Sequence, residues 1–441
     1  MALLRNVVLV AFVVVFIAVG CRSVAQENKE RLSAAELQDD LEQFRGIIES
    51  KHPQLYRFNS AEYFDSLFEA AENSFHDDMK IEDAFPHFSK IIASIGCGHS
   101  QISIPQWFWA NKESGYFPFQ VHIANEALFI TSSLTDDNNL SPASEISEIN
   151  GQPAIEILNQ LRSYTPGDGL WNSRRDWFIV QYFPWRIAAM FNFPNDYQIT
   201  FKRPDSDSSE NVTIEAARYN QLRSPSSTGK DFELKTDLEG KTALLRIRTF
   251  GYYDHVDAFK EYMDDAFMKI RNSKADNLIL DLRGNSGGDP HCSTHLFSYL
   301  IPKPLPYFGE KFFGYQKYAD PLPVFENRFK GKLYVLIDGG CFSTTGHFIG
   351  LLKYHNLATF VGQESGATYT CNDASMEFSL KHSGFNGRIA QRTYYTAVEG
   401  ISWSEGIQPD HLVIPSATDV IEGKDAVLDS RLQIIHNSYR R

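Results

Sequence analysis

Ser343 is the residue of this sequence best placed to act as a nucleophile. It follows an apolar stretch, LYVLIDGG, and precedes a helical pattern, so its hydroxyl is expected at the exposed start of a helix. At that position the backbone N–H of Thr344 could bind a developing oxyanion. Serine also commonly caps helix N-termini, so Ser343 alone leaves a purely structural role open.

His99 is the candidate base for this nucleophile. A catalytic serine needs a neighbouring group to take its proton, and the fold can bring the two together from distant parts of the sequence. His99 lies in GCGHSQISI, where glycines end a helical pattern and an alternating strand pattern begins, so it is expected on a turn. A histidine on a turn, taken alone, could equally be a surface residue.

Gly287 and Gly288 are the candidates for the rest of an oxyanion hole. They end the segment NLILDLRGNSGG, in which an apolar strand runs directly into a glycine-rich loop. Such a loop lets backbone N–H groups point into a cleft. The segment lacks the GxGxxG pattern of dinucleotide-binding loops, so a nucleotide site is not predicted.

The elements that must position these residues fall into three stretches. Residues 28–110 show helical periodicity, and residues 115–225 read mainly as strands with one helix. Within the second stretch, 168–193 is rich in Trp, Phe and Arg and is interpreted as an insertion. From 230 to 441 strands and helices alternate, which predicts a mainly parallel sheet with its ligand site beyond the carboxyl ends of the strands.

In combination the motifs resemble those of the S41 serine peptidases, the tail-specific or C-terminal processing family. LDLRGNSGG, the strand leading to FST, VGQESGAT and EGIQPD occur in the family's order, after a helical segment and a module in which SEISEINGQPAIEILNQL resembles part of a PDZ domain. The resemblance implies a multi-domain α/β fold. Its parts would be an N-terminal helical cap at 28–110, a PDZ-like module with an insertion at 115–225, and a crotonase- or ClpP-like α/β core at 230–441.

The resemblance also selects a catalytic version. Members with a Ser/Lys pair carry a Lys shortly after the VG strand, but here the stretch reads VGQESGATYT. GCGHS is similar to the turn of the tricorn-like and retinoid-binding-protein-like branch, which implies Ser343 as nucleophile and His99 as base. The acid that fixes the histidine would be Glu405 in SEGIQPD, with Glu399 as a rival. The oxyanion would be held by Gly287 or Gly288 together with Thr344.

These roles predict a serine endopeptidase that needs no metal and no cofactor. The PDZ-like module would bind peptide or protein substrates by strand addition, with recognition of a free C-terminus. An alternative is an inactive lipoprotein that binds apolar ligands or peptides on the same scaffold. An α/β-hydrolase esterase is disfavoured because Ser343 does not lie in a GxSxG pattern and the candidate histidine precedes the serine.

The first 21 residues resemble a signal peptide of the lipoprotein type. The apolar run Val7–Val19 is too short to cross a bilayer as a helix, and Gly20-Cys21 resembles a lipobox, so Cys21 is expected to carry a lipid. Simple secretory cleavage or a membrane anchor is the alternative. The prediction is therefore an exported protein of the bacterial cell envelope, an outer-membrane lipoprotein facing the periplasm or the cell surface.

Charge and cysteine content narrow the function further. The formal net charge is −13, which disfavours a nucleic-acid binder held by phosphate contacts. Four cysteines remain after Cys21, and their spacing does not reveal whether any of them pair. No pair of them has a CxxC spacing, so a structural zinc site is not predicted.

Overall fold

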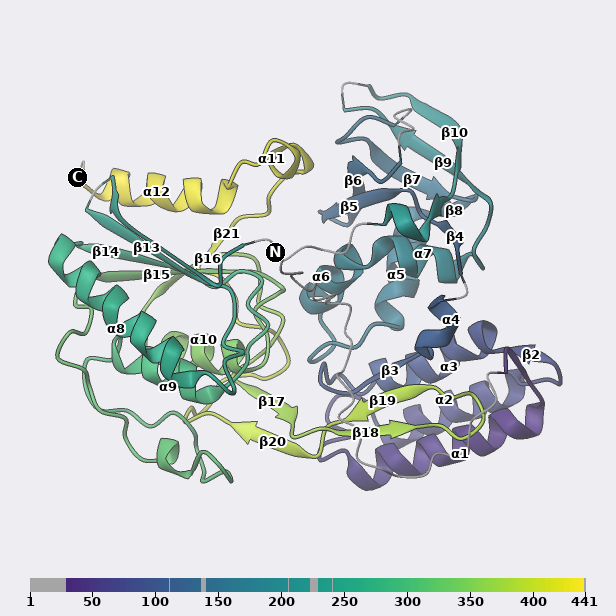
Figure 1. The fold of residues 1–441 in the computed structure, drawn as a ribbon, viewed down its shortest axis with the longest axis horizontal. Helices are drawn as coiled ribbons and strands as arrows, with labels where there is room; N and C mark the ends of the chain where they lie inside the picture. Colours follow the sequence, from purple (N-terminus) through teal and green to yellow (C-terminus); the bar gives the residue numbers. More distant parts are fainter. Residues whose placement is uncertain are drawn as a thin grey trace, which may run out of the picture.

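The computed structural model describes residues 29–110, 112–135, 140–204, 206–222, 229–239 and 241–439 of the chain. The expected signal segment, with Cys21, lies outside them. No helix of the described residues is long and apolar enough to span a membrane. Figure 1 shows three parts: a helical cap, a mainly β module and an α/β core. The predicted α/β fold class is confirmed.

The core is built on a six-stranded sheet in the order β12-β13-β14-β15-β16-β21. Its strands are β12 Phe232–Leu238, β13 Thr242–Ile247, β14 Asn277–Asp281, β15 Lys332–Ile337, β16 Thr359–Gly362 and β21 His411–Leu412. Strands β13, β14, β15, β16 and β21 run parallel to one another, and β12 pairs with β13 at the edge of the sheet in the antiparallel direction. Figure 1 shows α8 Val256–Ser273, α9 Pro290–Ser298 and α10 Thr344–Tyr354 on one face and α12 Ala426–Tyr439 on the other.

Burial on both faces explains why the core strands are apolar without interruption. In β13, Ala243 and Leu245 belong to the cluster under α8 to α10, whereas Leu244 faces the cluster under α12. The carboxyl ends of the parallel strands meet at one edge of the sheet. The glycine-rich loop after β14 and the Ser343 loop after β15 therefore lie side by side.

The cap consists of three helices and a small sheet. Its helices are α1 Ala34–Lys51, α2 Ala61–Ser74 and α3 Ile81–Ala93, and a short pair, β1 Arg31–Leu32 with β2 Met79–Lys80, joins their ends. Ser33 and Glu36 form a capping box that starts α1. After α3 the chain turns through His99 into β3 Gln101–Ser103. The turn that carries the candidate base is therefore anchored in the cap.

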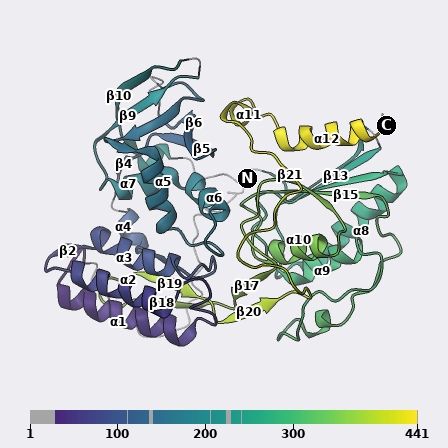
Figure 2. The same cartoon turned by 180° about the vertical axis from the view of Figure 1, so that it is seen from behind.

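The cap is completed by a segment from the C-terminal half of the chain. Strands β18 Met376–Ser379 and β19 Asn386–Ile389 leave the core, and β19 pairs with β3. Figure 2 shows this hairpin lying among the cap helices, reached through β17 Thr370–Asp373 and β20 Arg392–Tyr395. The sequence analysis assigned all of 230–441 to the core, so this excursion was not foreseen.

The module is an antiparallel sheet in the order β10-β9-β7-β6-β5, with β8 paired to β7. Its strands are β5 Phe119–Ala124, β6 Ala127–Ser133, β7 Glu145–Ile149, β8 Gln152–Pro153, β9 Asp196–Lys202 and β10 Ser209–Glu215. Helix α5 Ala154–Ser163 is followed by α6 Ser173–Gln181 and α7 Phe183–Met190, which lie within the segment 168–193 that the sequence analysis interpreted as an insertion. The pair β4 Ser114–Tyr116 and β11 Ala217–Arg218, with α4 Gln106–Ala110, leads to the cap.

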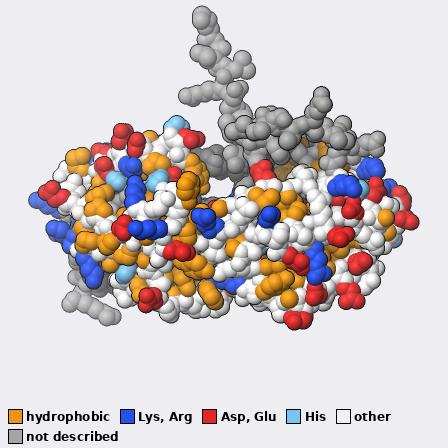
Figure 3. All heavy atoms as spheres, turned by 90° about the horizontal axis from the view of Figure 1, so that it is seen from below, with side chains coloured by type: hydrophobic (Ala, Val, Ile, Leu, Met, Phe, Trp, Pro, Cys, Tyr) orange, Lys and Arg blue, Asp and Glu red, His pale blue; other side chains and the backbone are white. Residues whose placement is uncertain are grey.

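Charge is dispersed over the surface that Figure 3 shows. Acidic and basic side chains are interspersed on this face, with no single basic patch gathered there.

Helix α11 Ala417–Ile421 bridges from the core to β5 and β6 of the module, and the ring of His122 lies 2.9 Å from the carbonyl oxygen of Pro415. The module therefore contacts the core through the chain's C-terminal region as well as through α6.

Asp40 provides a test of how the hairpin is held in the cap. Its fully buried carboxylate accepts the N–H groups of His382 at 2.8 Å and Ser383 at 2.7 Å. Replacing Asp40 by Ala leaves two donors without a partner, so we expect the free energy of unfolding to fall by about 3 kcal/mol in guanidinium titration. Asp39→Ala, which removes exposed pairings with the side chains of Lys381 and His382 and no backbone donor's partner, is the matched control and is expected to change little. Equal stability of the two variants would contradict this account.

Candidate active site

Ser343 lies between β15 and α10 in a strained backbone conformation. Its φ of 57° and ψ of −127° lie where residues other than glycine are rare. The turn is tight because Gly287 packs directly against it: a Cβ at Gly287 would come within 2.8 Å of the Ser343 Cβ. The strain and the close glycine together hold the hydroxyl at the carboxyl edge of the sheet, the geometry of a nucleophile elbow.

His99 meets Ser343 across the junction between cap and core. The Nε2 atom of His99 lies 3.0 Å from the Oγ atom of Ser343. The imidazole stacks on the ring of Phe342, with ring centroids 4.5 Å apart and an interplanar angle of 24°. Gly98 makes this stack possible, because a Cβ there would lie 2.6 Å from the Phe342 ring. The two predicted residues are therefore within hydrogen-bond distance.

The surroundings of His99 favour its neutral form. Its side chain is buried, and loss of hydration lowers the pKa of the imidazole below its ordinary value. The carboxylates of Asp373 and Asp168 act in the opposite direction, whereas Arg388 and Arg174 lower the pKa further. A neutral imidazole with Nε2 facing a hydroxyl can accept its proton.

Two backbone N–H groups near Ser343 can act as oxyanion donors. The N–H of Gly287 is already occupied, because it donates to Oδ1 of Asn285 at 2.9 Å. The N–H groups of Gly288 and Thr344 have no acceptor among the described residues, and the hydroxyl of Thr344 donates to the Gly288 carbonyl at 2.5 Å. Of the two glycines that the sequence offered, Gly288 is therefore the one whose N–H is free to bind a ligand.

Asn285 is a structural residue of this site that the sequence analysis did not single out. Its Oδ1 accepts the Gly287 N–H and the hydroxyl of Thr345, and its Nδ2 donates to the carbonyl of Ile247 at 3.1 Å. It thereby fastens the glycine loop to both β13 and the first turn of α10. The signal available in the sequence was an asparagine inside the glycine-rich loop, between Gly284 and Gly287.

The comparisons with known proteins can now be added to this geometry. Residues 241–413 match the family model described as peptidase family S41. The chain therefore contains a peptidase family S41 domain. It is a serine-type peptidase, and the matched residues include Ser343 and the glycine loop but not His99.

Solved structures agree on the fold of this S41 peptidase. Mature CPAF is similar with a TM-score of 0.67 and 14% sequence identity, covering 92% of this chain and 98% of that one. Mature CPAF complexed with lactacystin gives a TM-score of 0.66 and 14% identity, covering 92% of this chain and 99% of that one. No curated protein sequence matches the chain.

The acid proposed to fix His99 is not where the sequence analysis expected it. Glu405 and Glu399 are both exposed, and neither contacts His99 in the described structure. Two other carboxylates face the S41 peptidase's histidine. Oδ2 of Asp373 lies 3.7 Å from Nε2, and Oδ1 of Asp168 accepts the N–H of Gly98 at 2.9 Å. Both acids are distant in sequence from the EGIQPD motif, which explains why it did not reveal them.

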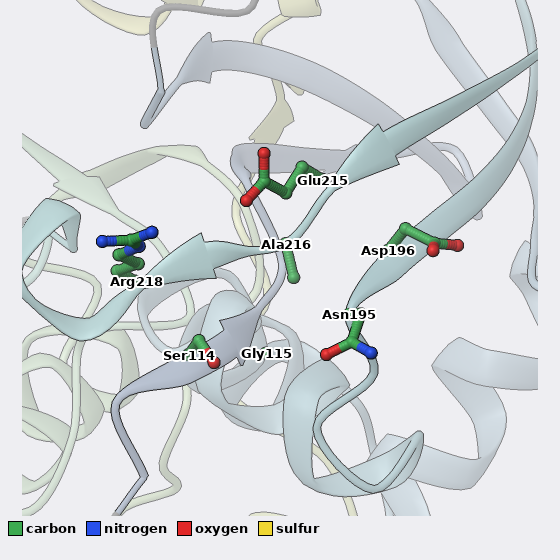
Figure 4. A pocket seen from close by; sticks show the side chains of 7 residues that line it. All are labelled: Ser114, Gly115, Asn195, Asp196, Glu215, Ala216 and Arg218. Atoms are coloured by element: carbon green, nitrogen blue, oxygen red, sulfur yellow. The ribbon is translucent and has the colours of Figure 1, made fainter.

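A cavity of this peptidase lies in the β module, away from the Ser343 site. It has a volume of about 440 Å³ and opens between β4, β11 and the ends of β9 and β10 (Figure 4). Its lining is largely polar: Ser114, Gly115, Asn195, Asp196, Glu215, Ala216 and Arg218. Such a lining does not suit an apolar ligand, one of the two ligand classes that the alternative interpretation of the sequence allowed.

The lowered pKa of His99 predicts the pH dependence of the peptidase. Protonation removes the base, and because burial lowers the folded pKa, activity should persist as the pH falls through 6.5 and disappear only below it. We expect the acidic limb of kcat/KM for a fluorogenic peptide, measured from about pH 4 to about pH 8, to have its midpoint below 6.5. Asp373→Asn should move the midpoint lower still. A midpoint above 6.5 would contradict the assigned electrostatics.

Proposed function

We propose that this S41 peptidase is an exported endopeptidase that cleaves peptide bonds through an acyl-enzyme on Ser343, with His99 as the base. The observation that carries the proposal is the 3.0 Å separation of Nε2 and Oγ. It joins the family's serine to a buried histidine that lies outside the matched domain. The family match supports the peptidase class, and this contact supports the mechanism.

The acylation step follows from the positions of these atoms. His99 Nε2 takes the proton of the Ser343 hydroxyl as Oγ bonds to the substrate carbonyl carbon. The carbonyl electron pair moves onto oxygen, where the N–H groups of Gly288 and Thr344 stabilise the charge. The tetrahedral intermediate collapses, the C–N bond breaks, and the proton on Nε2 passes to the leaving amine.

Deacylation repeats the same proton path with water. His99 removes a proton from water as its oxygen attacks the ester carbonyl of the acyl-enzyme. The oxyanion again occupies the site between Gly288 and Thr344, and collapse returns the proton to Ser343 Oγ. The product is a free carboxylate, and the enzyme is regenerated without a redox change.

Substrate capture is proposed to involve the PDZ-like module. Strand β5 lies at the end of the sheet order and on the side facing the core (Figure 1). An edge strand presents unpaired backbone groups, which can pair with an extended peptide. A protein or peptide substrate, recognised near its C-terminus, would thus be held on the side of the module that faces the core, which carries Ser343.

The mechanism predicts which substitutions abolish turnover. Ser343→Ala and His99→Ala should each lower kcat for peptide cleavage by at least about 10³-fold, and Ser343→Ala should also abolish covalent labelling by a fluorophosphonate. Ser273→Ala, at the exposed end of α8, is the matched control and should retain wild-type rates. If wild-type protein neither cleaves peptides nor takes up the fluorophosphonate, the catalytic proposal fails and a binding role becomes preferable.

We further propose that the protein is a lipoprotein of the bacterial cell envelope, attached through Cys21. The support is the sequence pattern of residues 1–21, an apolar run followed by Gly-Cys. In a bacterial host fed with labelled palmitate, the wild-type chain is expected to carry label and to sediment with membranes. Cys21→Ala should lose both properties, whereas an unlabelled wild-type chain would refute lipidation.

A further inference from the structure

Asp168 lies outside the S41-matched residues yet contacts the turn that carries His99. It belongs to the loop between α5 and α6, in the insertion of the PDZ-like module. Only 6% of its surface is exposed. Its Oδ1 accepts the N–H of Gly98 at 2.9 Å, so one oxygen of the carboxylate is fixed beside the residue that precedes the histidine.

The remaining polar atoms of this pair complement each other. Oδ2 of Asp168 and Nδ1 of His99 are both buried, and neither has a hydrogen-bond partner in the described structure. When Nε2 of a neutral imidazole accepts the serine proton, Nδ1 must carry the ring's hydrogen. A buried donor and a buried acceptor therefore lie beside the same turn, each lacking what the other supplies. In the described structure no nitrogen of His99 comes within 4.0 Å of an Asp168 oxygen, so the two atoms must approach each other to pair.

Two positive groups lie near Asp168. Arg57 and Arg174 both act to keep the carboxylate ionised, and neither has a carboxylate within 4.0 Å among the described residues. Arg57 and Asp168 line the same small cavity, and Nε and Nη2 of Arg57 have no partner. Burial raises the pKa of Asp168, whereas the charge of His99 is the largest favourable influence on its ionised form.

The other nearby acid is less suited to hold Nδ1. Asp373 approaches Nε2, the nitrogen already turned to Ser343, at 3.7 Å. Its Oδ1 accepts from Arg388 at 3.1 Å and from the hydroxyl of Ser375 at 3.0 Å. Asp373 can therefore stabilise the imidazolium by its charge, but it does not approach the opposite side of the ring.

We propose that Asp168 is the positioning residue of the catalytic histidine, so that the PDZ-like module supplies the third member of a Ser343-His99-Asp168 triad. The inference rests on the proposed Ser343/His99 mechanism. In the substrate complex, where catalytic hydrogen bonds tighten, Asp168 Oδ2 receives the Nδ1–H of His99. This bond fixes the tautomer in which Nε2 can accept a proton and stabilises the imidazolium formed in acylation.

The packing of α6 shows how Asp168 is kept beside the turn that carries His99. A Cβ on Gly339 would lie 2.1 Å from the Ser173 carbonyl oxygen, and one on Gly340 would lie 2.7 Å from Nε1 of Trp177. The guanidinium of Arg174 lies 4.2 Å from the centre of the Phe342 ring, the ring on which His99 stacks. The insertion therefore packs directly against the nucleophile loop, so the docking of the module and the placement of Asp168 beside the His99 turn depend on the same contacts.

The decisive experiment compares Asp168→Asn with Asp168→Glu in the full-length chain. Asp168→Asn should lower kcat for peptide cleavage and the rate of fluorophosphonate labelling by about 10²-fold to 10⁴-fold, with KM changed less than about threefold. Asp168→Glu keeps the charge and should recover at least about tenfold of that loss. Asp40→Asn removes a buried carboxylate that also binds backbone N–H groups, so it controls for a merely structural effect and should lower stability alone.

The pH profile separates positioning from packing. Loss of the Asp168 charge should move the acidic limb of kcat/KM to lower pH, because that carboxylate raises the pKa of His99. The other charged or titratable groups that act on His99 stay unchanged in the variant: Asp373 on β17, Arg388 on β19, Arg174 on α6 and His347 on α10. An unshifted limb, with the same loss of kcat, would overturn the positioning role.

A measurement on the wild-type protein guards against a variant that fails to fold. In ¹⁵N spectra at a pH where His99 is neutral, the proposal requires the hydrogen on Nδ1, and a hydrogen on Nε2 would overturn it. Failure of this inference is distinct from failure of the proposed function. If Asp168→Asn keeps kcat within about threefold while Ser343→Ala and His99→Ala are inactive, only the inference falls. If the Ser343 or His99 variants remain active, the mechanism itself falls.

Discussion

The hydrogen bond between His99 and Ser343 joins residues that are 244 positions apart and belong to different parts of the molecule. This bond, 3.0 Å long, can persist only if the cap and the core are held firmly in register. The stack of His99 on Phe342 and the absence of a side chain at Gly98 provide that register directly. Much of the rest of the architecture serves to keep these two surfaces together.

The core meets this requirement by rigidity. Its parallel strands are buried on both faces, and the loops that follow β14 and β15 leave the sheet at the same edge. Asn285 joins the glycine loop to β13 and to α10, and Asp338 accepts the N–H groups of Gly284 and Gly340 from the two loops. The oxyanion donors and the nucleophile are thereby fixed relative to each other before any substrate binds.

The sequence was informative wherever local pattern determines structure. Strand and helix alternation indicated the α/β core, and the apolar strands ending in glycine or serine led to Ser343, Gly288 and Thr344. Hydrogen-bond partners depend on distances between remote segments, so the occupation of the Gly287 N–H by Asn285 could not be read. The same limit applies to the carboxylates near His99. Asp168 lies in a segment without a recognised motif, so no sequence pattern indicated it. Glu405 lies in the recognised EGIQPD motif, but it is exposed and does not contact His99 in the described structure.

The pairing of Ile102 in β3 with Gly387 in β19 has a consequence for how the enzyme comes into being. Contacts between such distant residues form late, since the loop between them must close first. A chain growing from its N-terminus contains the histidine turn early but lacks the strand that braces it until almost the whole polypeptide has emerged. Topology alone therefore delays the braced histidine turn, and with it the complete site, until the growing chain has passed β19.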